Sequence, residues 1–379
     1  MKILVLNWQD ITNPLAGGAE VHLHEVFERI ARRGHDVTLF CHRYRGSSRE
    51  ELRNGIRIIR QGGRFLFNYL VPIRYLLKFR KEHFDVVIDD INKIPFFTPL
   101  FVREPIIAVT HHLFGRSIFL EAIFPFAFYI FLFERLIKPV YRNVPFIVGS
   151  PSTYREYTEW GFRRDQVTII NYCVNKEIYY PSLNDEHEPY RICYFGRLKR
   201  YKSIDHLLEA CSLLRKDYPE LTLDIIGDGD DRTRLENVTK KLDLRDQVHF
   251  HGFIDEKKKA PLLHKMRFAV QPSSKEGWGL TVIEANACGV PVIAADVPGL
   301  RDSVKNNVTG ILYPYGNIES LASAMRILLD DADLRRKMSV NAREWANSFD
   351  WAIAAEKTLE IIHEHVQHIS RESFRKSMK

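Results

Sequence analysis

Short runs of β-branched and other apolar residues alternate along this chain with longer amphipathic segments. Ten of these runs are strand candidates, at residues 2–7, 36–41, 85–90, 106–111, 146–150, 190–196, 221–227, 248–253, 268–273 and 291–296. Strands that alternate with helix-length segments are typical of a parallel sheet whose two faces are covered by helices. The chain is therefore predicted to be an α/β protein of the doubly wound type.

The alternating pattern starts twice. Its first series ends near Ser150, and a polar, proline-containing stretch precedes the strand candidate at 190–196. We expect two Rossmann-like domains, 1–178 and 179–355, and a C-terminal helix at about 356–379 that packs back on the first domain. Ligands of such sheets bind beyond the carboxyl ends of the strands. We therefore expect the functional residues just after strands, in a cleft between two facing domains.

Composition restricts the compartment and the partners. The first ten residues, MKILVLNWQD, lack the long apolar segment of a secretory signal, and the five cysteines form no C-x-x-C pair, which favours a cytoplasmic protein with reduced thiols. The net charge of +7 belongs to the first half, with 25 Lys and Arg against 18 Asp and Glu in residues 1–178 and 30 against 30 in the rest. Such a basic half suits nucleic acid, an anionic membrane or an acidic substrate. No RNP motif or zinc-finger spacing is present, so we expect no nucleic-acid partner.

Two segments of the first half are unusually apolar. Residues 64–81 form a basic amphipathic stretch with apolar residues at helical spacing, namely Leu66, Leu70, Ile73 and Leu77. Residues 118–137 are rich in aromatic side chains, but Glu121 and Pro125 interrupt them, so a transmembrane helix is not expected. Two interpretations remain open: both segments pack inside the first domain, or both meet the inner face of the cytoplasmic membrane peripherally.

Two motifs of the first half follow strand candidates. Gly17 and Gly18 lie between the first strand and an amphipathic segment, where their amides would approach a phosphate, although a tight turn also explains them. His111 and His112 follow the strand at 106–111, and one ring should point into the cleft. No third metal-ligand type lies at suitable spacing, so we favour a hydrogen bond to a ligand over a metal.

The second half places cations and glycines after strands. Arg197 and Lys202 lie between a strand and a helix, an arrangement that suits a diphosphate. Gly227 and Gly229 form a turn with two aspartates, Asp228 and Asp230. An Asp-x-Asp pair can hold a divalent metal, but we favour a turn because the two cations would neutralise a diphosphate without one.

Residues 273–293 place two acids eight residues apart around a Gly-Trp-Gly corner. A strand is expected to end at Ser273, and a helix to follow the corner and end at Gly289. Glu276 then lies on the loop and Glu284 about one turn inside the helix. Each ionised carboxylate can accept hydrogen bonds from two adjacent hydroxyls, as sugars supply. A glycosidase-like acid and base pair is the alternative for these two residues.

Taken together, these motifs resemble glycosyltransferase family four, the retaining, nucleotide-sugar-dependent enzymes of the GT-B fold. The resemblance covers nearly the whole chain and implies two facing Rossmann-like domains with an interdomain cleft. It rests on GGAE (17–20), THH (110–112), SPST (150–153), FGRLKRYKSID (195–205), IIGDGD (225–230), FHGFI (250–254) and EGWGLTVIEANACGVPVIA (276–294). The last of these contains the E-x7-E signature of the family.

The resemblance implies a role for each matching residue. Glu276 would hold hydroxyls of the transferred sugar, and Glu284 the ribose of the nucleotide. The implied catalytic set is Glu276, His112, Arg197 and Lys202, with the two cations as a diphosphate clamp and His112 near the reacting carbon. The remaining implied donor contacts are Gly17, Gly18, His111 as the second choice for the cleft histidine, Gly227, Gly229, Phe253, Ile254, Gly277, Gly279, Leu280 and Thr281.

The resemblance also implies the reaction partners. The co-substrate would be a UDP- or GDP-linked sugar, with no tightly bound cofactor and no required metal, and the acceptor a glycan or a lipid-linked glycan in cell-surface polysaccharide or glycolipid synthesis. Two positions depart from the family pattern: Ser203 replaces the usual glycine after the clamp lysine but should still cap a helix, and NYCVN (171–175) replaces NGVD.

Rival functions have less support. An inactive, membrane-associated sugar-binding protein of the same fold would be expected to lose its charged site residues. All four are present here, namely Arg197, Lys202, Glu276 and Glu284. A dinucleotide-dependent oxidoreductase would need G-x-G-x-x-G after the first strand, and residues 7–20 contain no such motif. Another GT-B activity, such as phosphorolysis or epimerisation, has no motif in its favour.

Overall fold

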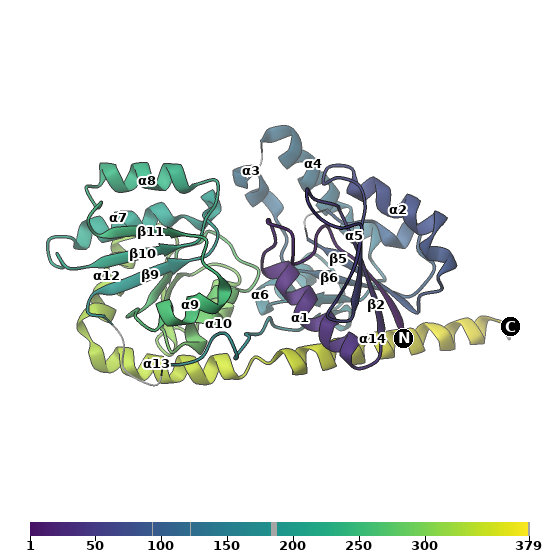
Figure 1. The fold of residues 1–379 in the computed structure, drawn as a ribbon. Coiled ribbons are helices and arrows are strands. Elements are labelled where there is room, and N and C mark those ends of the chain that lie inside the picture. The colour runs from purple at the N-terminus through teal and green to yellow at the C-terminus, as the bar shows by residue number, and fades with distance from the viewer. Residues whose placement is uncertain (93, 122, 183–187, 378–379) are drawn as a thin grey trace. The chain divides into compact units, whose positions relative to one another are not determined.

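The computed structural model describes residues 1–92, 94–121, 123–182 and 188–377. The chain divides into two compact units (Figure 1): the first unit is Met1–Tyr172 with Trp351–Lys379, and the second unit is Cys173–Asp350. The boundary between the two units after Tyr172 thus lies shortly before the boundary predicted from the sequence, at residue 178. The predicted C-terminal helix is α14 (Trp351–Ser377), and the last two residues of the predicted range, 378 and 379, lie outside the described residues.

Within its described residues, the first unit is built on an eight-stranded sheet of order β3-β4-β2-β1-β5-β6-β7-β8. Neighbouring strands are parallel except β3, which runs antiparallel to β4 at the edge. The strands are β1 (Lys2–Leu6), β2 (Asp36–Cys41), β3 (Glu50–Arg53), β4 (Ile56–Arg60), β5 (Val86–Ile91), β6 (Ile106–Thr110), β7 (Phe146–Val148) and β8 (Val167–Ile169). The strand order reverses between β1 and β5, so the loops after these two strands flank the switch point of this sheet.

The helices of the first unit include the C-terminal segment. They are α1 (Gly18–Arg32), α2 (Phe67–Leu77), η1 (Phe79–Lys81), η2 (Thr98–Leu100), η3 (Gly115–Ser117), α3 (Ile118–Glu121), α4 (Phe124–Arg135), α5 (Ile137–Val140), α6 (Pro151–Glu159), η4 (Arg164–Gln166) and α14. Helix α14 packs beside α1, where Arg33 lies 3.9 Å from Glu356 and the rings of His35 and His363 are 5.8 Å apart. The C-terminal helix therefore belongs to the first unit.

The second unit, as far as it is described, contains a six-stranded, all-parallel sheet of order β11-β10-β9-β12-β13-β14. Its strands are β9 (Arg191–Phe195), β10 (Thr222–Ile226), β11 (Val248–Gly252), β12 (Ala269–Gln271), β13 (Val292–Ala295) and β14 (Gly310–Tyr313). Its helices are η5 (Arg200–Lys202), α7 (Ile204–Leu214), α8 (Arg232–Lys241), α9 (Glu256–Leu263), α10 (Leu280–Ala287), α11 (Leu300–Ser303), α12 (Ile318–Asp330) and α13 (Ala332–Asn347). The switch point lies between β9 and β12.

The burial pattern explains why these segments are strands. Successive residues of a strand face opposite sides of the sheet, and in both β1 and β9 the last four residues are all buried. Both faces of each central strand are therefore covered, as the doubly wound prediction requires. All ten predicted strands are present. Four further strands, β3, β4, β8 and β14, were not predicted.

The two unusual apolar segments form helices with exposed apolar side chains. Helix α2 buries Phe67, Val71 and Tyr75, so most of the apolar stripe identified in the sequence faces solvent. In α2, α4 and the residues beside them, eleven large apolar side chains are each at least 46% exposed: Phe65, Leu66, Tyr69, Ile73, Leu76, Leu77, Ile123, Phe124, Phe126, Phe128 and Leu132. Burial inside the unit thus explains only part of these segments. Across the described chain, each helix is too short or too polar to cross a membrane.

Candidate active site

A contact between Lys202 and Glu276 marks the switch point of the second unit. Lys202 ends η5 in the loop after β9, and Glu276 lies in the loop after β12. The ammonium of Lys202 forms an ion pair with the Glu276 carboxylate, and the two side chains are 10% and 16% exposed. The backbone amide and the hydroxyl of Ser274 both donate to the carbonyl of Tyr201, at 2.8 and 3.0 Å. The sheet therefore brings together two predicted catalytic residues from loops that are joined by these hydrogen bonds.

The ion pair fixes the charge of Lys202. Burial alone would lower the pKa of this ammonium, but the adjacent Glu276 carboxylate outweighs burial and raises the pKa of Lys202 well above its usual value. Lys202 is therefore a cation at any physiological pH. Once a ligand separates the pair, the ammonium can bind a phosphate of that ligand, and the carboxylate can accept a hydrogen bond from an adjacent hydroxyl group.

Ser203, which follows Lys202, occupies a position where glycine would fit better. Its backbone is left-handed, with φ of 49°, a conformation that glycine adopts without steric cost. The predicted cap is wrong, because the Ser203 side chain caps no amide of α7. Its hydroxyl instead lies 3.0 Å from the hydroxyl of Tyr315. Arg197 precedes this turn on the same loop and is exposed.

Gly227 and Gly229 are explained by backbone packing. A Cβ on Gly227 would lie 1.9 Å from the carbonyl oxygen of Gly196, and one on Gly229 would lie 2.0 Å from that of Leu198. The loop after β10 therefore packs directly on the loop that carries Arg197 and Lys202. This packing alone explains why both positions are glycine. The contact of Gly227 and Gly229 with a donor stays a prediction.

The neighbouring Asp-x-Asp pair behaves as a turn. Asp228 accepts a hydrogen bond from the amide of Gly229 at 2.7 Å, and Asp230 pairs with Lys199 at 2.6 Å. Among the residues that the structure describes, no three His, Cys, Asp or Glu side chains converge as metal ligands.

The E-x7-E segment forms the predicted loop and helix. A side chain on Gly299, whose φ is 83°, would place its Cβ 2.3 Å from the carbonyl oxygen of Glu276, so this glycine lets two backbone segments touch. Gly279 has φ of 91° and begins α10. The N–H groups of Leu280 and Thr281 lie in the first turn of α10, where a helix offers them no acceptor, and they form the positive end of the helix dipole.

Glu284 is buried inside α10 and has an altered protonation equilibrium. Burial, assisted by the negative charge of Glu256 and opposed by Lys259, raises the pKa of Glu284 to about 7. At neutral pH this carboxyl is therefore present in both its ionised form, which only accepts hydrogen bonds, and its protonated form, which can also donate one. Phe253, one of the predicted donor contacts, directly follows β11 and is 82% exposed, while Ile254 beside it is partly buried.

In the first unit, a buried acid holds the first residue of the glycine pair. The amide of Gly17 donates to the Glu20 carboxylate at 2.7 Å, and the Asn92 side chain donates to the other oxygen of Glu20 at 2.8 Å. Because Glu20 occupies the Gly17 amide, Gly18 is the better candidate for a phosphate contact. Glu20 was not predicted as a site residue, although an acid three residues after a helix-capping position is a known signal.

The histidine pair is resolved by hydrogen bonding. In His111, Nε2 lies 2.7 Å from the Asp90 carboxylate and Nδ1 contacts the Tyr172 hydroxyl, so both ring nitrogens are bonded to protein atoms. Burial lowers the pKa of His111, but Asp90 outweighs it and the pKa is raised. His112 is partly exposed, with its ring 4.5 Å from that of Phe114. This geometry favours His112 over His111 as the ligand-facing residue.

Two family models match the chain in sequence order. Residues 16–178 match Glycosyltransferase Family 4, and residues 175–345 match Glycosyl transferases group 1. The chain belongs to glycosyltransferase family 4. Glu276, Glu284, Arg197 and Lys202 all lie in the matched part of the second unit, and Gly17, Gly18 and His112 in that of the first.

Relatives and solved structures agree with this assignment. Glycogen synthase from Mycobacterium tuberculosis is 30% identical over 218 residues, which are 57% of this glycosyltransferase and 53% of that protein, so the chain spans about half the length of the curated relatives it matches. Sucrose-phosphate synthase from Thermosynechococcus elongatus superposes with a TM-score of 0.80 at 23% identity, covering 96% of this chain and 98% of that one. HepE from Anabaena, solved with UDP-glucose, gives 0.75 at 18%, covering 96% and 100%. The predicted GT-B fold is confirmed.

Proposed function

We propose that this protein transfers a sugar from a UDP- or GDP-linked donor to a hydroxyl of a glycan or lipid-linked acceptor, with retention of configuration. The contact between Lys202 and Glu276 at the switch point is the observation that carries the proposal. It places a cation suited to a phosphate beside a carboxylate suited to a sugar hydroxyl, on the two loops where ligands of such sheets bind. The UDP-glucose bound to HepE, which has the same fold, supports a nucleotide-sugar donor.

The proposed chemistry depends on charge stabilisation. Lys202, Arg197 and the first-turn amides of α10 stabilise the negative charge that develops on the departing diphosphate. Glu276 accepts hydrogen bonds from hydroxyls of the sugar as its anomeric carbon becomes oxocarbenium-like, and His112 lies near that carbon. The acceptor hydroxyl then attacks from the face that the diphosphate leaves, so no covalent nucleophile is needed. The ion pair must open for both partners to reach the donor.

The remaining donor contacts fix the nucleotide. The buried Glu284 holds the ribose hydroxyls, and the exposed ring of Phe253 stacks on the base. Gly18 brings the amino end of α1 to the phosphates. No metal is required in this proposal, because Arg197 and Lys202 together offset the charge of the diphosphate.

An activity screen tests the proposal. The purified protein is incubated with UDP- and GDP-linked sugars, and the released nucleoside diphosphate is measured with and without candidate acceptors. We expect one donor to be consumed, an acceptor to accelerate its consumption, and proton NMR of the product to show the anomeric configuration of the donor. An inverted product would overturn the proposed mechanism, and consumption of none of these donors would overturn the function.

A second feature favours a lipid-linked acceptor at an anionic membrane. The apolar side chains exposed on α2 and α4, defined above, form what we call the α2–α4 surface. The hydroxyls of Tyr69 and Tyr129 lie 3.0 Å apart and join the two helices. Beside them, a cavity of about 240 Å³ is lined mainly by apolar side chains, including Pro72, Leu100, Phe101 and Phe133.

Cations accompany the α2–α4 surface. Arg64, Arg80 and Lys81 are exposed at the ends of the α2 region. Basic residues near an anionic surface contribute about 1 kcal/mol each, and a buried large apolar side chain contributes about 1.5–3 kcal/mol. The combination suits a peripheral protein at the inner face of the cytoplasmic membrane, where a lipid-linked acceptor would also lie.

Vesicle flotation tests the membrane contact. Leu77→Ser with Phe124→Ser should lower binding to phosphatidylglycerol vesicles by about tenfold or more, because two exposed apolar side chains are lost. Leu213→Ser is the matched control, since Leu213 is an exposed leucine of α7 in the second unit. Equal binding by the double variant and the control, or no binding by the wild-type protein at low salt, would contradict the membrane proposal.

A further inference from the structure

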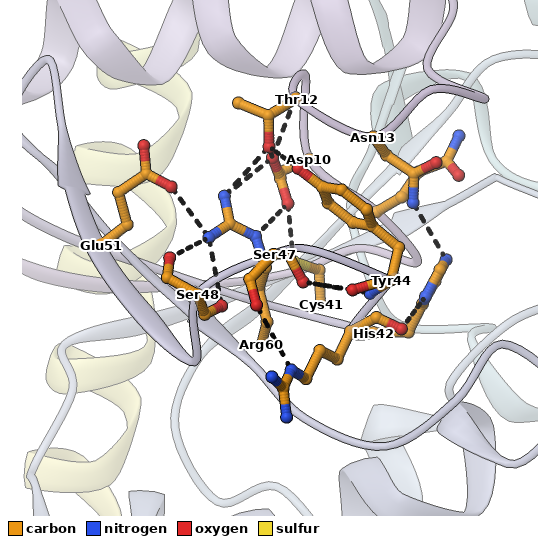
Figure 2. A network of polar contacts seen from close by, with 12 residues as sticks. Asp10, Thr12, Asn13, Cys41, His42, Tyr44, Ser47, Ser48, Glu51 and Arg60 are labelled. Atoms are coloured by element: carbon orange, nitrogen blue, oxygen red, sulfur yellow. Dashed lines mark hydrogen bonds and ion pairs between the residues drawn. The ribbon is translucent and has the colours of Figure 1, made fainter.

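A buried ion pair anchors the loop that precedes the glycine pair. Asp10 lies in the loop between β1 and α1, and Arg60 is the last residue of β4. The guanidinium of Arg60 donates two hydrogen bonds to the Asp10 carboxylate, from Nε to Oδ2 at 2.7 Å and from Nη2 to Oδ1 at 3.0 Å. The two side chains are 1% and 0% exposed. Figure 2 shows this pair at the centre of a network of polar side chains.

All five N–H groups of Arg60 have acceptors. Beyond the two bonds to Asp10, Nη2 donates to the Thr12 hydroxyl at 3.1 Å. Nη1 donates to the Ser48 hydroxyl at 3.1 Å and to the Glu51 carboxylate at 2.9 Å. An arginine has five such donors in a rigid plane, so full use of them permits one orientation of the surrounding groups. Arg60 therefore joins the β1–α1 loop to β3 and to the turn before it.

Asp10 is held equally firmly from its own side. Its carboxylate also accepts the amide of Thr12 at 2.9 Å, the Thr12 hydroxyl, and the thiol of Cys41 at 3.4 Å. Burial alone would raise the pKa of Asp10, but the hydrogen bonds from Arg60 and Thr12 outweigh it and hold the pKa well below its usual range. The carboxylate therefore stays ionised and paired with Arg60 at any physiological pH.

A continuous series of short-range bonds leads from Asp10 to the glycine pair. The amide of Asn13 donates to the carbonyl of Asp10 at 3.1 Å, and the amide of Ala16 donates to the carbonyl of Asn13 at 2.8 Å. The Asn13 side chain also accepts the amide of Leu15 at 2.9 Å. Gly17 follows directly and is held by Glu20. The loop is thus fixed by one buried carboxylate at its start and by another at its end.

A buried ion pair is weak as a source of stability, because removing two charges from water offsets most of their attraction. What it supplies is one defined geometry, since any other arrangement leaves a buried charge without its partner. We propose that Asp10 and Arg60 are positioning residues that hold the β1–α1 loop so that Gly18 meets the donor phosphates. This role rests on the proposed function, although the order of the loop can be measured without it.

The second unit offers a matched control. Arg191 likewise donates two hydrogen bonds to Asp224, from Nε to Oδ2 at 2.6 Å and from Nη2 to Oδ1 at 3.3 Å, and Asp224 is fully buried. Each arginine also binds a more exposed glutamate, Glu51 for Arg60 and Glu188 for Arg191. Arg191, however, is the first residue of β9, at the end of the strand opposite the loop that carries Lys202. Breaking this pair should cost stability without disturbing a ligand-binding loop.

The test compares Asp10→Asn with Asp224→Asn. Both should lower the midpoint of thermal unfolding, but only Asp10→Asn should increase hydrogen exchange of the amides in residues 11–18. Only Asp10→Asn should lower kcat/KM for the nucleotide sugar, by about tenfold or more, because a small displacement of a positioning loop has large effects on rate. Arg60→Lys, which keeps the charge but has fewer donors, should share both effects and replaces Asp10→Asn if that variant does not fold.

The two readouts separate this inference from the proposed function. Unchanged exchange in residues 11–18 of the Asp10→Asn or Arg60→Lys protein would overturn the positioning role. An equal fall in kcat/KM for Asp224→Asn would also overturn it, because the effect would then follow from stability alone. If the wild-type protein consumes no nucleotide sugar, the proposed function fails, and exchange alone decides whether the pair positions the loop.

Discussion

The two units use ion pairs differently around the loops at their switch points. In the second unit, Lys202 and Glu276 form a pair whose side chains keep 10% and 16% exposure, so a ligand can reach both and separate them. In the first unit, Asp10 and Arg60 are almost completely sealed from solvent, and every donor of the arginine is used within the protein. Under the proposed function, the charges of the second unit bind the donor, whereas the buried pair of the first unit holds a backbone loop in place.

The largest expected effect concerns the partly exposed pair of Lys202 and Glu276. Glu276→Gln keeps a hydrogen-bond acceptor for Lys202 but removes the charge, and we expect kcat to fall by about 100-fold or more. The free energy of unfolding should change far less, because the side chain remains hydrogen-bonded. Steady-state kinetics and urea unfolding of the same preparation measure the two quantities.

A nearby pair provides the control for Glu276. Lys199 and Asp230 lie on loops of the same switch region and pair at 2.6 Å, but their side chains are 39% and 70% exposed. Asp230→Asn should leave kcat within about twofold of the wild-type value, since exposed pairs contribute little. Wild-type turnover by Glu276→Gln would remove Glu276 from the mechanism and end the distinction between the two pairs.

The next prediction concerns Glu284, a buried acid of the second unit with no arginine to hold its charge. Its pKa is raised from 4.5 to about 7 in the folded state. Between these values the folded protein keeps a proton that the unfolded chain has lost, so the stability that this group contributes falls as pH rises. The total loss is about 3 kcal/mol and is complete above pH 7.

Glu284→Gln removes this dependence on pH. The free energy of unfolding of the variant minus that of the wild-type protein should therefore grow by about 2.5 kcal/mol between pH 5 and pH 8. Urea unfolding at the two pH values measures it, and the other ionisable groups cancel in the subtraction. An identical difference at both values would show that Glu284 is ionised in the folded protein, like Asp10.

A smaller effect is expected for the affinity of the nucleotide. Lys202→Met removes a cation from the proposed diphosphate site and should weaken the binding of the nucleoside diphosphate by about tenfold to a hundredfold. Lys199→Met, which removes the exposed cation three residues earlier, should change it by less than about threefold. Isothermal titration calorimetry distinguishes the two, and equal losses would indicate a general electrostatic effect in place of a defined clamp.

Local sequence patterns predicted much of the fold and which residues gather at the switch point of the second unit. Strands such as β1 and β9 are buried on both faces, and their continuous apolar runs identify them. Lys202 and Glu276 follow such strands, and in a parallel sheet the residues after neighbouring strands meet at one edge. The β4 strand was missed because Arg57 and Arg60 break its apolar run, and β4 lies next to the edge strand β3.

Contacts that depend on tertiary structure could not be read in the same way. Asp10 and Arg60 are 50 residues apart, and each alone resembles an ordinary surface charge. Gly227 and Gly229 fit a phosphate turn equally well in sequence, and only their distance to the backbone of Gly196 and Leu198 reveals the packing requirement. The choice between His111 and His112 likewise needed the position of Asp90 and Tyr172.

The central claim, a nucleotide-sugar site built on Lys202 and Glu276, is tested most directly by thermal unfolding with UDP, GDP and their sugars. We expect the nucleotides of one base to stabilise the wild-type protein, by about 2.7 kcal/mol at a concentration one hundred times the dissociation constant. At the same concentration, Lys202→Met should lose most of this stabilisation and Lys199→Met should keep it. If the nucleotides stabilise the Lys202→Met and wild-type proteins equally, or stabilise neither, the claim is contradicted.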